Sequence, residues 1–166
     1  MRVLGLDPGL TCAGYGVVDA ARGGMSMVAF GAIRTPQGPV PGRLLSMHGR
    51  IQELLAAHRP DAVAIERVVF NANVRTAMSV GQAAGVAFLA AAQCGCEVAE
   101  YAAGQVKLAV CGDGAAGKRQ VQLMVARLLD LAEPPSPPDA ADALGLAITH
   151  LRTARMRSLE KRAARA

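Results

Sequence analysis

The sequence predicts one compact α/β domain with a mixed five-stranded sheet flanked by helices. Three observations favour this fold class. Apolar strand-like segments alternate with helical ones, the first three strands follow one another directly, and 166 residues with 52% hydrophobic content suffice for one core. Aromatic residues make up only 3% of the chain, so the core must consist mainly of Ala, Val, Leu, Ile and Met.

The N-terminal part predicts an antiparallel meander. Strands are expected at residues 2–7, 13–19 and 25–34. The segment 19–24 is rich in Gly and Asp and predicts the turn between the second and third strands, and a Pro- and Gly-rich loop follows at 35–42.

The rest of the chain alternates helices and strands. The predicted elements, in order, are a helix from about Leu44 to Pro60, a strand ending at Glu66, a helix from Asn71 or Asn73 to about Gln93, a strand at 98–101, and helices at 103–110, at 118–131 and from about Asp139. Pro60 and Gly95 are expected to end the two longer helices. The Pro-rich segment 133–138 predicts a stiff linker to the last helix.

Positive charge is concentrated at the C-terminal end. Residues 151–166 contain six basic residues and one acidic residue, a net charge of +5 that equals the charge of the whole chain, so the remainder is neutral. We therefore expect a folded domain at 1–152 and a basic C-terminal tail at 153–166. Such a tail could attract a polyanion or could simply be solvated and aid solubility.

The four cysteines and the N-terminus bear on the cellular compartment. The close pair Cys94 and Cys96 lacks a second such pair or a nearby His, so a zinc site is not expected and we predict reduced, mostly buried thiols. No apolar run reaches the roughly 18 residues of a membrane span, and the chain begins with strand-like sequence rather than a secretion signal. A cytoplasmic protein is expected.

Four acidic residues stand out by their sequence context. Asp7 and Glu66 each end a strand apolar enough to be buried on both faces, where a charge is costly unless a cation or a partner neutralises it. Asp139 and Asp142 lie three apart at the start of the last helix and so share one face. If the two strands are neighbours, the four carboxylates converge on one pocket, whose hard oxygen ligands suit Mg²⁺ or Mn²⁺. Taken singly, Asp139 could instead be a helix N-cap and Asp142 a favourable charge in the first turn.

Five groups of short motifs recur along the chain from Arg2 to about His150. They are Leu6-Asp7-Pro8-Gly9-Leu10 with Gly14-Tyr15-Gly16, Ala64-Ile65-Glu66, Gly81-Gln82-Ala83, Tyr101-Ala102-Ala103 with Gln105-Val106-Lys107, and Asp139-Ala140-Ala141-Asp142-Ala143-Leu144. Each motif is weak alone, but all of them in this order and spacing are highly specific. Together they resemble the RuvC family, bacterial Holliday-junction endonucleases of the ribonuclease H-like superfamily.

The resemblance implies an enzyme that resolves four-way DNA junctions by paired nicks in recombination and repair. Asp7, Glu66, Asp139 and Asp142 match the family's metal-binding acids, and the implied cofactor is a pair of Mg²⁺ ions, with Mn²⁺ as the expected substitute. Two ions about 3.5 to 4 Å apart activate a water and stabilise the leaving 3′ oxygen, which leaves 5′-phosphate and 3′-hydroxyl ends. Asp7, on the innermost strand, is the expected bridging ligand. A homodimer and the branch-migration proteins RuvA and RuvB are the implied partners.

Basic residues near the matched motifs are candidate DNA contacts. Lys107 and Lys118 fall where family members carry basic residues near the active site, and Lys118 is also expected to stabilise charge on the scissile phosphate. Arg75 and Arg119 lie beside matched segments and could hold phosphates. An ordinary solvated helix face is the alternative for all four.

One departure from the family pattern concerns an aromatic residue. Many members have a Phe three residues after the catalytic Glu, where it can stack on an unpaired base, whereas this chain has Val69 there and Phe70 one position later. Phe70 is therefore a candidate DNA contact, with a role in the core as the alternative.

The sequence also contains features of other protein classes. Residues 112–119 nearly form a phosphate-binding P-loop, but Arg119 replaces the required Ser or Thr, and the chain is too short for an actin-like ATPase. A junction-binding protein without cleavage activity and an enzyme that trims structured RNA remain open. Gly81 and Gly85 could form a dimer face or pack against the domain's own sheet.

Overall fold

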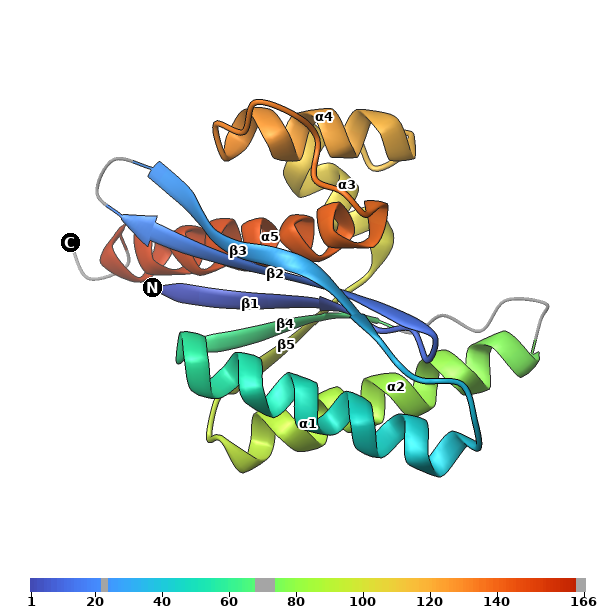
Figure 1. Cartoon of the computed structure of the whole chain (residues 1–166). Helices are drawn as coiled ribbons and strands as arrows, with labels where there is room; N and C mark the ends of the chain where they lie inside the picture. Colours follow the sequence, from blue (N-terminus) through green and yellow to red (C-terminus); the bar gives the residue numbers. More distant parts are fainter. Residues whose placement is uncertain (22–23, 68–73, 164–166) are drawn as a thin grey trace.

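The computed structural model describes residues 1–21, 24–67 and 74–163, without the side chains of Val74, Arg75, Ser158, Lys161 and Arg162. In chain order the elements are β1 (Arg2–Asp7), β2 (Cys12–Ala21), β3 (Gly24–Arg34), α1 (Val40–His58), β4 (Ala62–Glu66), α2 (Val74–Gln93), β5 (Glu97–Tyr101), α3 (Ala103–Cys111), α4 (Lys118–Leu128) and α5 (Pro138–Ala163) (Figure 1). The expected α/β fold with a mixed five-stranded sheet is confirmed.

The sheet has the strand order β3-β2-β1-β4-β5, which makes β1 the central strand. β1 pairs antiparallel with β2 and β2 antiparallel with β3, so the expected meander is confirmed. β1 pairs parallel with β4, with Leu6 opposite Ile65, and β4 pairs parallel with β5. The carboxyl ends of the three parallel strands therefore lie at one edge, with Asp7 beside Glu66.

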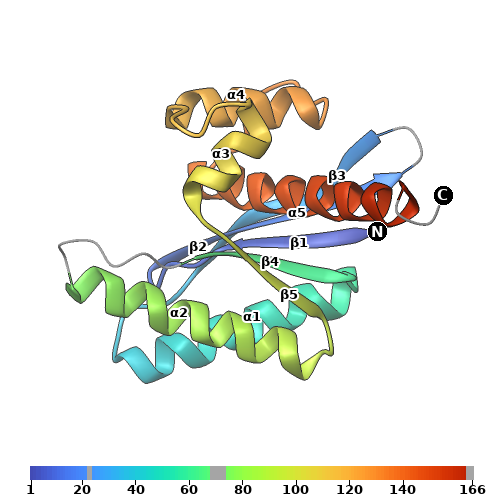
Figure 2. The same ribbon diagram turned by 180° about the vertical axis from the view of Figure 1, so that it is seen from behind.

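Helices cover both faces of the sheet. α1 and α2 lie on one face, while α5 lies across the other with α3 and α4 beyond it, as the two opposite views show (Figures 1 and 2). Each face has its own apolar cluster: Leu4, Leu6 and Met47 belong to the one under α1 and α2, and Leu144 and Ile148 to the one under α5. The N-terminal end of α5 lies at the same edge as the carboxyl ends of β1 and β4.

α5 approaches the sheet closely because three glycines line its path. A Cβ atom at Gly5 would overlap the backbone oxygen of Ala143, and one at Gly14 would overlap the backbone oxygen of Asp139. A Cβ at Gly16 would lie 2.6 Å from the side chain of Leu144. These glycines therefore set the distance between β1, β2 and the helix that carries Asp139 and Asp142.

Element boundaries differ from the predictions at several places. β2 continues to Ala21, so the first part of the predicted turn at 19–24 is strand. α1 begins at Val40, inside the predicted loop, because Pro41 is tolerated in the first turn of a helix. α4 ends at Leu128 rather than residue 131, since Asp130 adopts a left-handed conformation with φ of 54°. α5 continues without a break past residue 152 to Ala163, so residues 153–163 extend this helix.

Two predictions about individual residues have a clear outcome. The cysteines are free thiols as expected, but the prediction that they are mostly buried is wrong: Cys94 is exposed and Cys12, Cys96 and Cys111 are partly exposed. Gly95 ends α2 with a φ of 69°, as expected. The predicted caps Asn71 and Asn73 lie outside the described residues.

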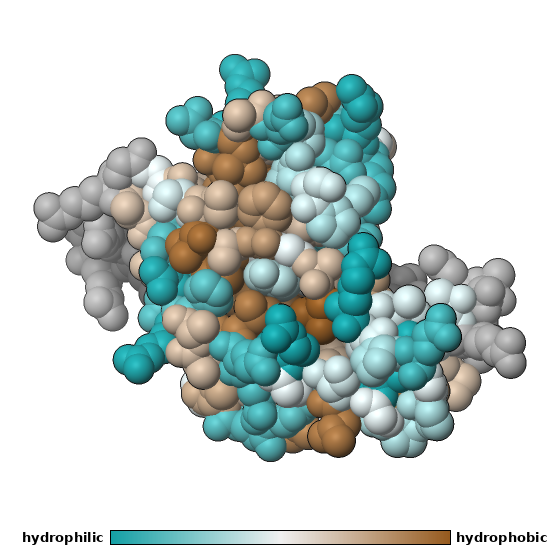
Figure 3. Space-filling model, in the orientation of Figure 1, coloured by the Kyte–Doolittle hydropathy of each residue, from teal (hydrophilic) through white to brown (hydrophobic). Residues whose placement is uncertain are grey.

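Apolar and hydrophilic side chains are unevenly distributed over the surface. On the face shown in Figure 3, apolar atoms lie mainly across the middle, over the β3 edge of the sheet, while the outer turns of α1 and α4 are mostly hydrophilic. Among the described residues, the structure contains no helix that is both long and apolar enough to span a membrane.

Candidate active site

Two of the four predicted acids lie side by side at the end of neighbouring parallel strands. Asp7 and Glu66 each follow a fully buried run, and their own side chains are only partly buried. Both are on the face of the sheet covered by α5, because Gly5 and Ala64 on the same side of their strands contact that layer. Their carboxylates therefore point toward the start of α5.

α5 supplies the other two acids. Oxygen atoms of Asp7, Asp139 and Asp142 all lie within 4.8 Å of one another, and all three side chains are partly buried. Glu66 is outside this set of three but lies close enough to Asp7 to raise the pKa of its carboxyl group. The structure thus brings all four predicted acids together, with Asp7 between Glu66 on one side and the two residues of α5 on the other.

The electrostatics of the cluster are unfavourable without a cation. Burial, followed by the charge and hydrogen bond of Glu66 and the charges of Asp142 and Asp139, raises the pKa of Asp7 to about 8. A carboxyl group with this pKa holds a proton at neutral pH, and a divalent ion would replace that proton. Four clustered carboxylates with hard oxygen atoms are the ligands that Mg²⁺, Mn²⁺ and Ca²⁺ prefer.

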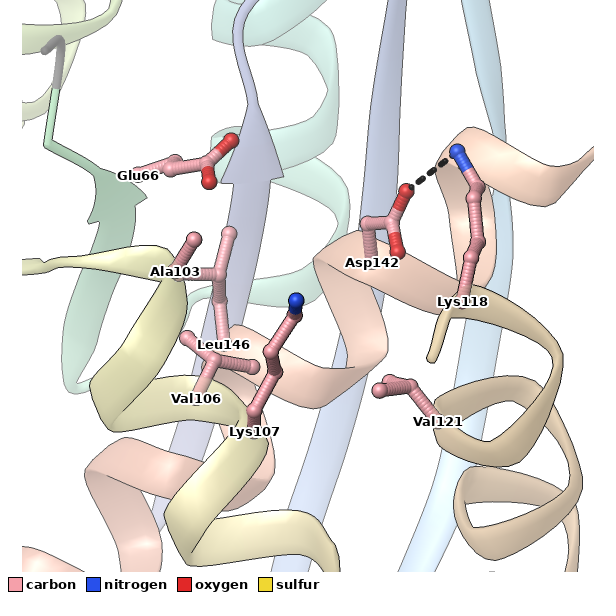
Figure 4. A pocket seen from close by; sticks show the side chains of 8 residues that line it. All are labelled: Glu66, Ala103, Val106, Lys107, Lys118, Val121, Asp142 and Leu146. Atoms are coloured by element: carbon pink, nitrogen blue, oxygen red, sulfur yellow. Dashed lines mark ion pairs between the residues drawn. The ribbon is translucent and has the colours of Figure 1, made fainter. Parts of the chain in front are cut away.

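A pocket of about 240 Å³ opens beside the acids (Figure 4). Its polar lining residues are Glu66, Lys107, Lys118 and Asp142, and its apolar lining consists of Ala103, Val106, Val121 and Leu146. Figure 4 shows the two lysines reaching from α3 and α4 toward the same space as the carboxylates. Acidic and basic side chains therefore alternate around the pocket, and this mixed charge suits a phosphate held beside cations.

Lys118 makes the one ion pair found in this pocket among the described residues. Its Nζ lies 3.0 Å from Oδ2 of Asp142. The hydrogen bond and charge of Asp142, together with Asp139 and Asp7, raise the pKa of Lys118 despite partial burial. Lys118 is therefore charged throughout the physiological range and lies beside the acidic cluster.

The remaining predicted DNA contacts do not share this placement. Arg119 is exposed and does not line the pocket, since a residue next to Lys118 on a helix points about 100° away from it. Phe70 and the side chain of Arg75 lie outside the described residues.

The alternative interpretation of residues 112–119 as a P-loop fails on local structure. Gly112 follows the last residue of α3 and Gly117 precedes the first residue of α4, so the segment joins two helices. A P-loop instead connects a strand to a helix, where the backbone N–H groups surround a phosphate.

Cys12 is a neighbour of the site that the sequence patterns did not indicate. Burial and a hydrogen bond with Asp139 raise the pKa of its thiol, and Arg34 is close enough to act on the same thiol in the opposite direction. The only sequence signal was the position of Cys12 at the start of the strand that returns beside Asp7.

The sheet order and the carboxylates at its edge place the protein in the class of ribonuclease H-like nucleases. Residues 3–150 match the family profile described as "Crossover junction endodeoxyribonuclease RuvC". The chain belongs to this family. The protein of that name from Salinispora arenicola is 52% identical over 153 residues, which cover 91% of this chain and 87% of the relative.

Two solved structures agree with this assignment. The structure of Thermus thermophilus RuvC has a TM-score of 0.87 and 41% identity, covering 94% of this chain and 96% of that one. The structure of Thermus thermophilus RuvC in complex with Holliday junction substrate has a TM-score of 0.88 and 40% sequence identity, with the same coverage of both chains. The predicted family, fold and enzyme class are therefore confirmed.

Proposed function

We propose that the protein resolves four-way DNA junctions by two symmetric nicks, each a metal-dependent hydrolysis of a phosphodiester at the pocket beside Asp7. The observation that carries this proposal is the convergence of Asp7, Asp139 and Asp142, with Glu66 beside Asp7, next to a pocket with two lysines. Membership of the crossover junction endodeoxyribonuclease RuvC family supports four-way DNA as the substrate. The expected roles are DNA recombination and repair.

The four carboxylates are the proposed metal ligands. Asp7 lies between Glu66 and the two residues of α5, so it is the carboxylate that two ions would most readily share, and Glu66, Asp139 and Asp142 would hold them from either side. Mg²⁺ is the proposed ion and Mn²⁺ the expected substitute. When bound, such ions lower the pKa of a water and stabilise the leaving oxygen.

One experiment separates this function from its competitors. The protein is incubated with Mg²⁺ and with a labelled four-way DNA junction, a linear duplex of the same sequence and an RNA hairpin. Paired nicks in the junction alone support the proposal. Binding without cleavage would identify a junction-binding protein, and preferential cutting of the hairpin would identify an RNA-trimming enzyme.

Lys118 is the proposed electrostatic contributor to catalysis. Its ammonium group lies 3.0 Å from a metal ligand, close to where a scissile phosphate must sit. A fixed positive charge there interacts with the transition state, which carries more charge on the phosphate oxygens than the ground state does. Lys107, which lines the same pocket without an ion pair to any described residue, is the proposed contact to the ground-state phosphate.

Replacing Lys118 by Met should lower the cleavage rate of bound junction by about 10²-fold and weaken junction binding much less. Single-turnover cleavage and a binding titration measure the two quantities separately. Arg127→Met is the matched control, since it removes an exposed charge from the last turn of the same helix, outside the pocket, and it should affect the rate and the affinity little. An equal loss of affinity and rate in Lys118→Met would make Lys118 a phosphate anchor only.

A homodimer is proposed because two symmetric nicks require two active sites. Gly81 and Gly85 on α2 have no atom within 4 Å of where a Cβ would lie, so the alternative that they pack against the domain's own sheet is wrong. Met78 and Leu89 on the same helix are 59% and 53% exposed. This open stripe of small and apolar residues is the proposed dimer face, where glycines let a second helix approach closely.

A charge in this stripe should separate the dimer. Leu89→Glu is expected to give a monomer by light scattering at working concentration, because burying an unpaired carboxylate is costly. Leu45→Glu is the matched control, because Leu45 is 74% exposed on α1 and outside the stripe. A dimer that survives Leu89→Glu unchanged would place the interface elsewhere.

Further contacts follow from the family resemblance alone. Phe70 is the proposed stacking residue for an unpaired base, Arg75 and Arg119 are proposed phosphate contacts, and RuvA and RuvB are the proposed protein partners. The basic segment 153–166, whose first part extends α5, is the proposed electrostatic contact to a DNA arm. A cytoplasmic location is proposed.

A further inference from the structure

We propose that Arg34 binds a DNA phosphate on the β3 side of the active site, away from Lys107, so that the cleaved strand is held from both sides of the acidic cluster. The inference rests on the proposed function and extends it. Lys107 lies on α3, which follows the edge strand β5. Strand order puts β2 and β3 on the other side of β1, and Arg34 is the last residue of β3.

Strand register places Arg34 on the face of the sheet that carries the acids. Arg34 lies directly opposite Cys12 in the antiparallel pair of β2 and β3. Opposed residues of such a pair point to the same face. Cys12 lies two residues before Gly14 on β2 and so faces the same way, and Gly14 contacts the backbone of Asp139 at the start of α5. The Arg34 side chain therefore emerges on the α5 face, next to a proposed metal ligand.

Arg34 takes no part in the polar contacts that stabilise the fold. Its side chain is exposed and makes no hydrogen bond or ion pair with any residue in the described ranges. By contrast, the guanidinium of the nearby Arg43 donates hydrogen bonds to the Leu10 carbonyl and to the hydroxyls of Thr11 and Thr35. Arg43 thus stabilises the fold at this corner, while the guanidinium of Arg34 is unpaired and exposed to solvent.

The backbone beside Arg34 is held firmly. The Thr35 hydroxyl donates to the Leu10 carbonyl at 2.6 Å, and the Thr35 backbone N–H donates to the Thr11 carbonyl at 3.3 Å. These bonds and those of Arg43 tie the end of β3 to the turn that follows Asp7. A guanidinium on such a fixed base is preorganised to hold a phosphate oxygen by a charge-assisted, bidentate hydrogen bond.

A cation on this side of the site would favour DNA binding. The four carboxylates repel the phosphates of a strand that enters the pocket, and two divalent ions would only balance the charge of these acids. Phosphates flanking the scissile one would therefore gain no net attraction from the cluster. Phosphate contacts of this kind fix the register of the nucleic acid without reading its sequence. Arg34 would therefore position the strand on β3 while Lys107 and Lys118 act on α3 and α4.

Replacing Arg34 by Ala tests the proposal. Junction affinity should fall about tenfold at fixed salt, the dependence of log affinity on log salt should become shallower by about one phosphate contact, and Arg34→Lys should recover part of the loss. The melting temperature should not change, since Arg34 has no partner in the described part of the chain. Arg50→Ala is the matched control, because Arg50 is an exposed arginine on α1, across the sheet from the site, and should leave affinity unchanged.

A modified substrate identifies the phosphate itself. Neutral methylphosphonates are placed one at a time beside the cleavage position. One position should weaken binding of the wild-type protein about tenfold and weaken Arg34→Ala no further. The proposal would be overturned if the affinity losses caused by the methylphosphonate and by Arg34→Ala were additive at every position. It would also be overturned if saturating Mg²⁺ alone restored the affinity of Arg34→Ala. If the wild-type protein neither binds nor cuts the junction, the proposed function itself fails.

Discussion

Replacing Asp7 by Asn is expected to abolish cleavage while junction binding persists. Asp7 lies between Glu66 and the pair Asp139 and Asp142, and an amide cannot replace a carboxylate shared by two cations. We expect a rate below about one thousandth of that of the wild-type protein, since water activation and leaving-group stabilisation both depend on the bound ions. Single-turnover cleavage measures the loss, and a binding titration shows that the junction is still held. Normal cutting by Asp7→Asn would refute its role.

The same substitution should stabilise the metal-free protein at high pH. The pKa of Asp7 is near 3.8 in the unfolded chain and about 8 in the folded protein, so between these values the folded state binds more protons. The ionisation of Asp7 therefore lowers the free energy of unfolding progressively as pH rises from about 4 to about 8. The amide of the variant carries no such charge, so the stability of Asp7→Asn relative to the wild-type protein should be higher at pH 9 than at pH 4.

Thermal unfolding with and without Mg²⁺ separates this effect from others. Mg²⁺ should raise the melting temperature of the wild-type protein more at pH 8 than at pH 5, because the ligands must lose their proton to bind the ion. Glu133→Gln, an exposed carboxyl in the loop before α5, is the control and should show neither the pH effect nor a change in the Mg²⁺ response. Equal stability of Asp7→Asn and the wild-type protein across this range would mean that the cluster does not strain the fold.

Gly14→Ala is expected to cause the second largest loss of activity. A methyl group there would overlap the backbone oxygen of Asp139, and backbone cannot rotate away as a side chain can. α5 must move from the sheet, which carries Asp139 and Asp142 away from Asp7. A displacement near 1 Å costs about 10²-fold in rate, and overpacking of this kind costs about 2–3 kcal/mol of stability.

Another glycine provides the control. Gly49 lies inside α1 with no atom within 4 Å of where a Cβ would lie, so Gly49→Ala should stabilise the protein by about 0.5–1 kcal/mol and leave cleavage unchanged. Cleavage and chemical unfolding are measured on both variants. A fully active Gly14→Ala protein would show that the spacing between α5 and β2 does not set the geometry of the site.

The strands and the four acids could be predicted because their signals are local. Continuous apolar runs ending in Asp7 and Glu66 identify buried strands, and the spacing of Asp139 and Asp142 places both on one helical face. Because β1 and β4 are neighbours in the sheet, the acids at their ends had to meet. The family resemblance then added the two lysines, which helical periodicity alone leaves as ordinary surface residues.

What the sequence did not reveal depends on contacts between distant segments. The close approach of Gly14 to the backbone of Asp139 involves residues far apart in the chain, and no pattern near Gly14 predicts it. The outward orientation of Gly81 and Gly85 became clear only once the packed face of α2 was known. Arg34 and Arg43 look alike as exposed arginines beside turns, and only the hydrogen bonds of Arg43 distinguish them.

The proposed ligands in β1, β4 and α5 come from well-separated parts of the chain. A nascent polypeptide can therefore assemble the full set only after residue 142 has been released from the ribosome, and a proteolytic fragment lacking α5 loses two of the four acids at once. Copies that lack α5 should therefore not cut DNA, a consequence of chain order alone that requires no inhibitor.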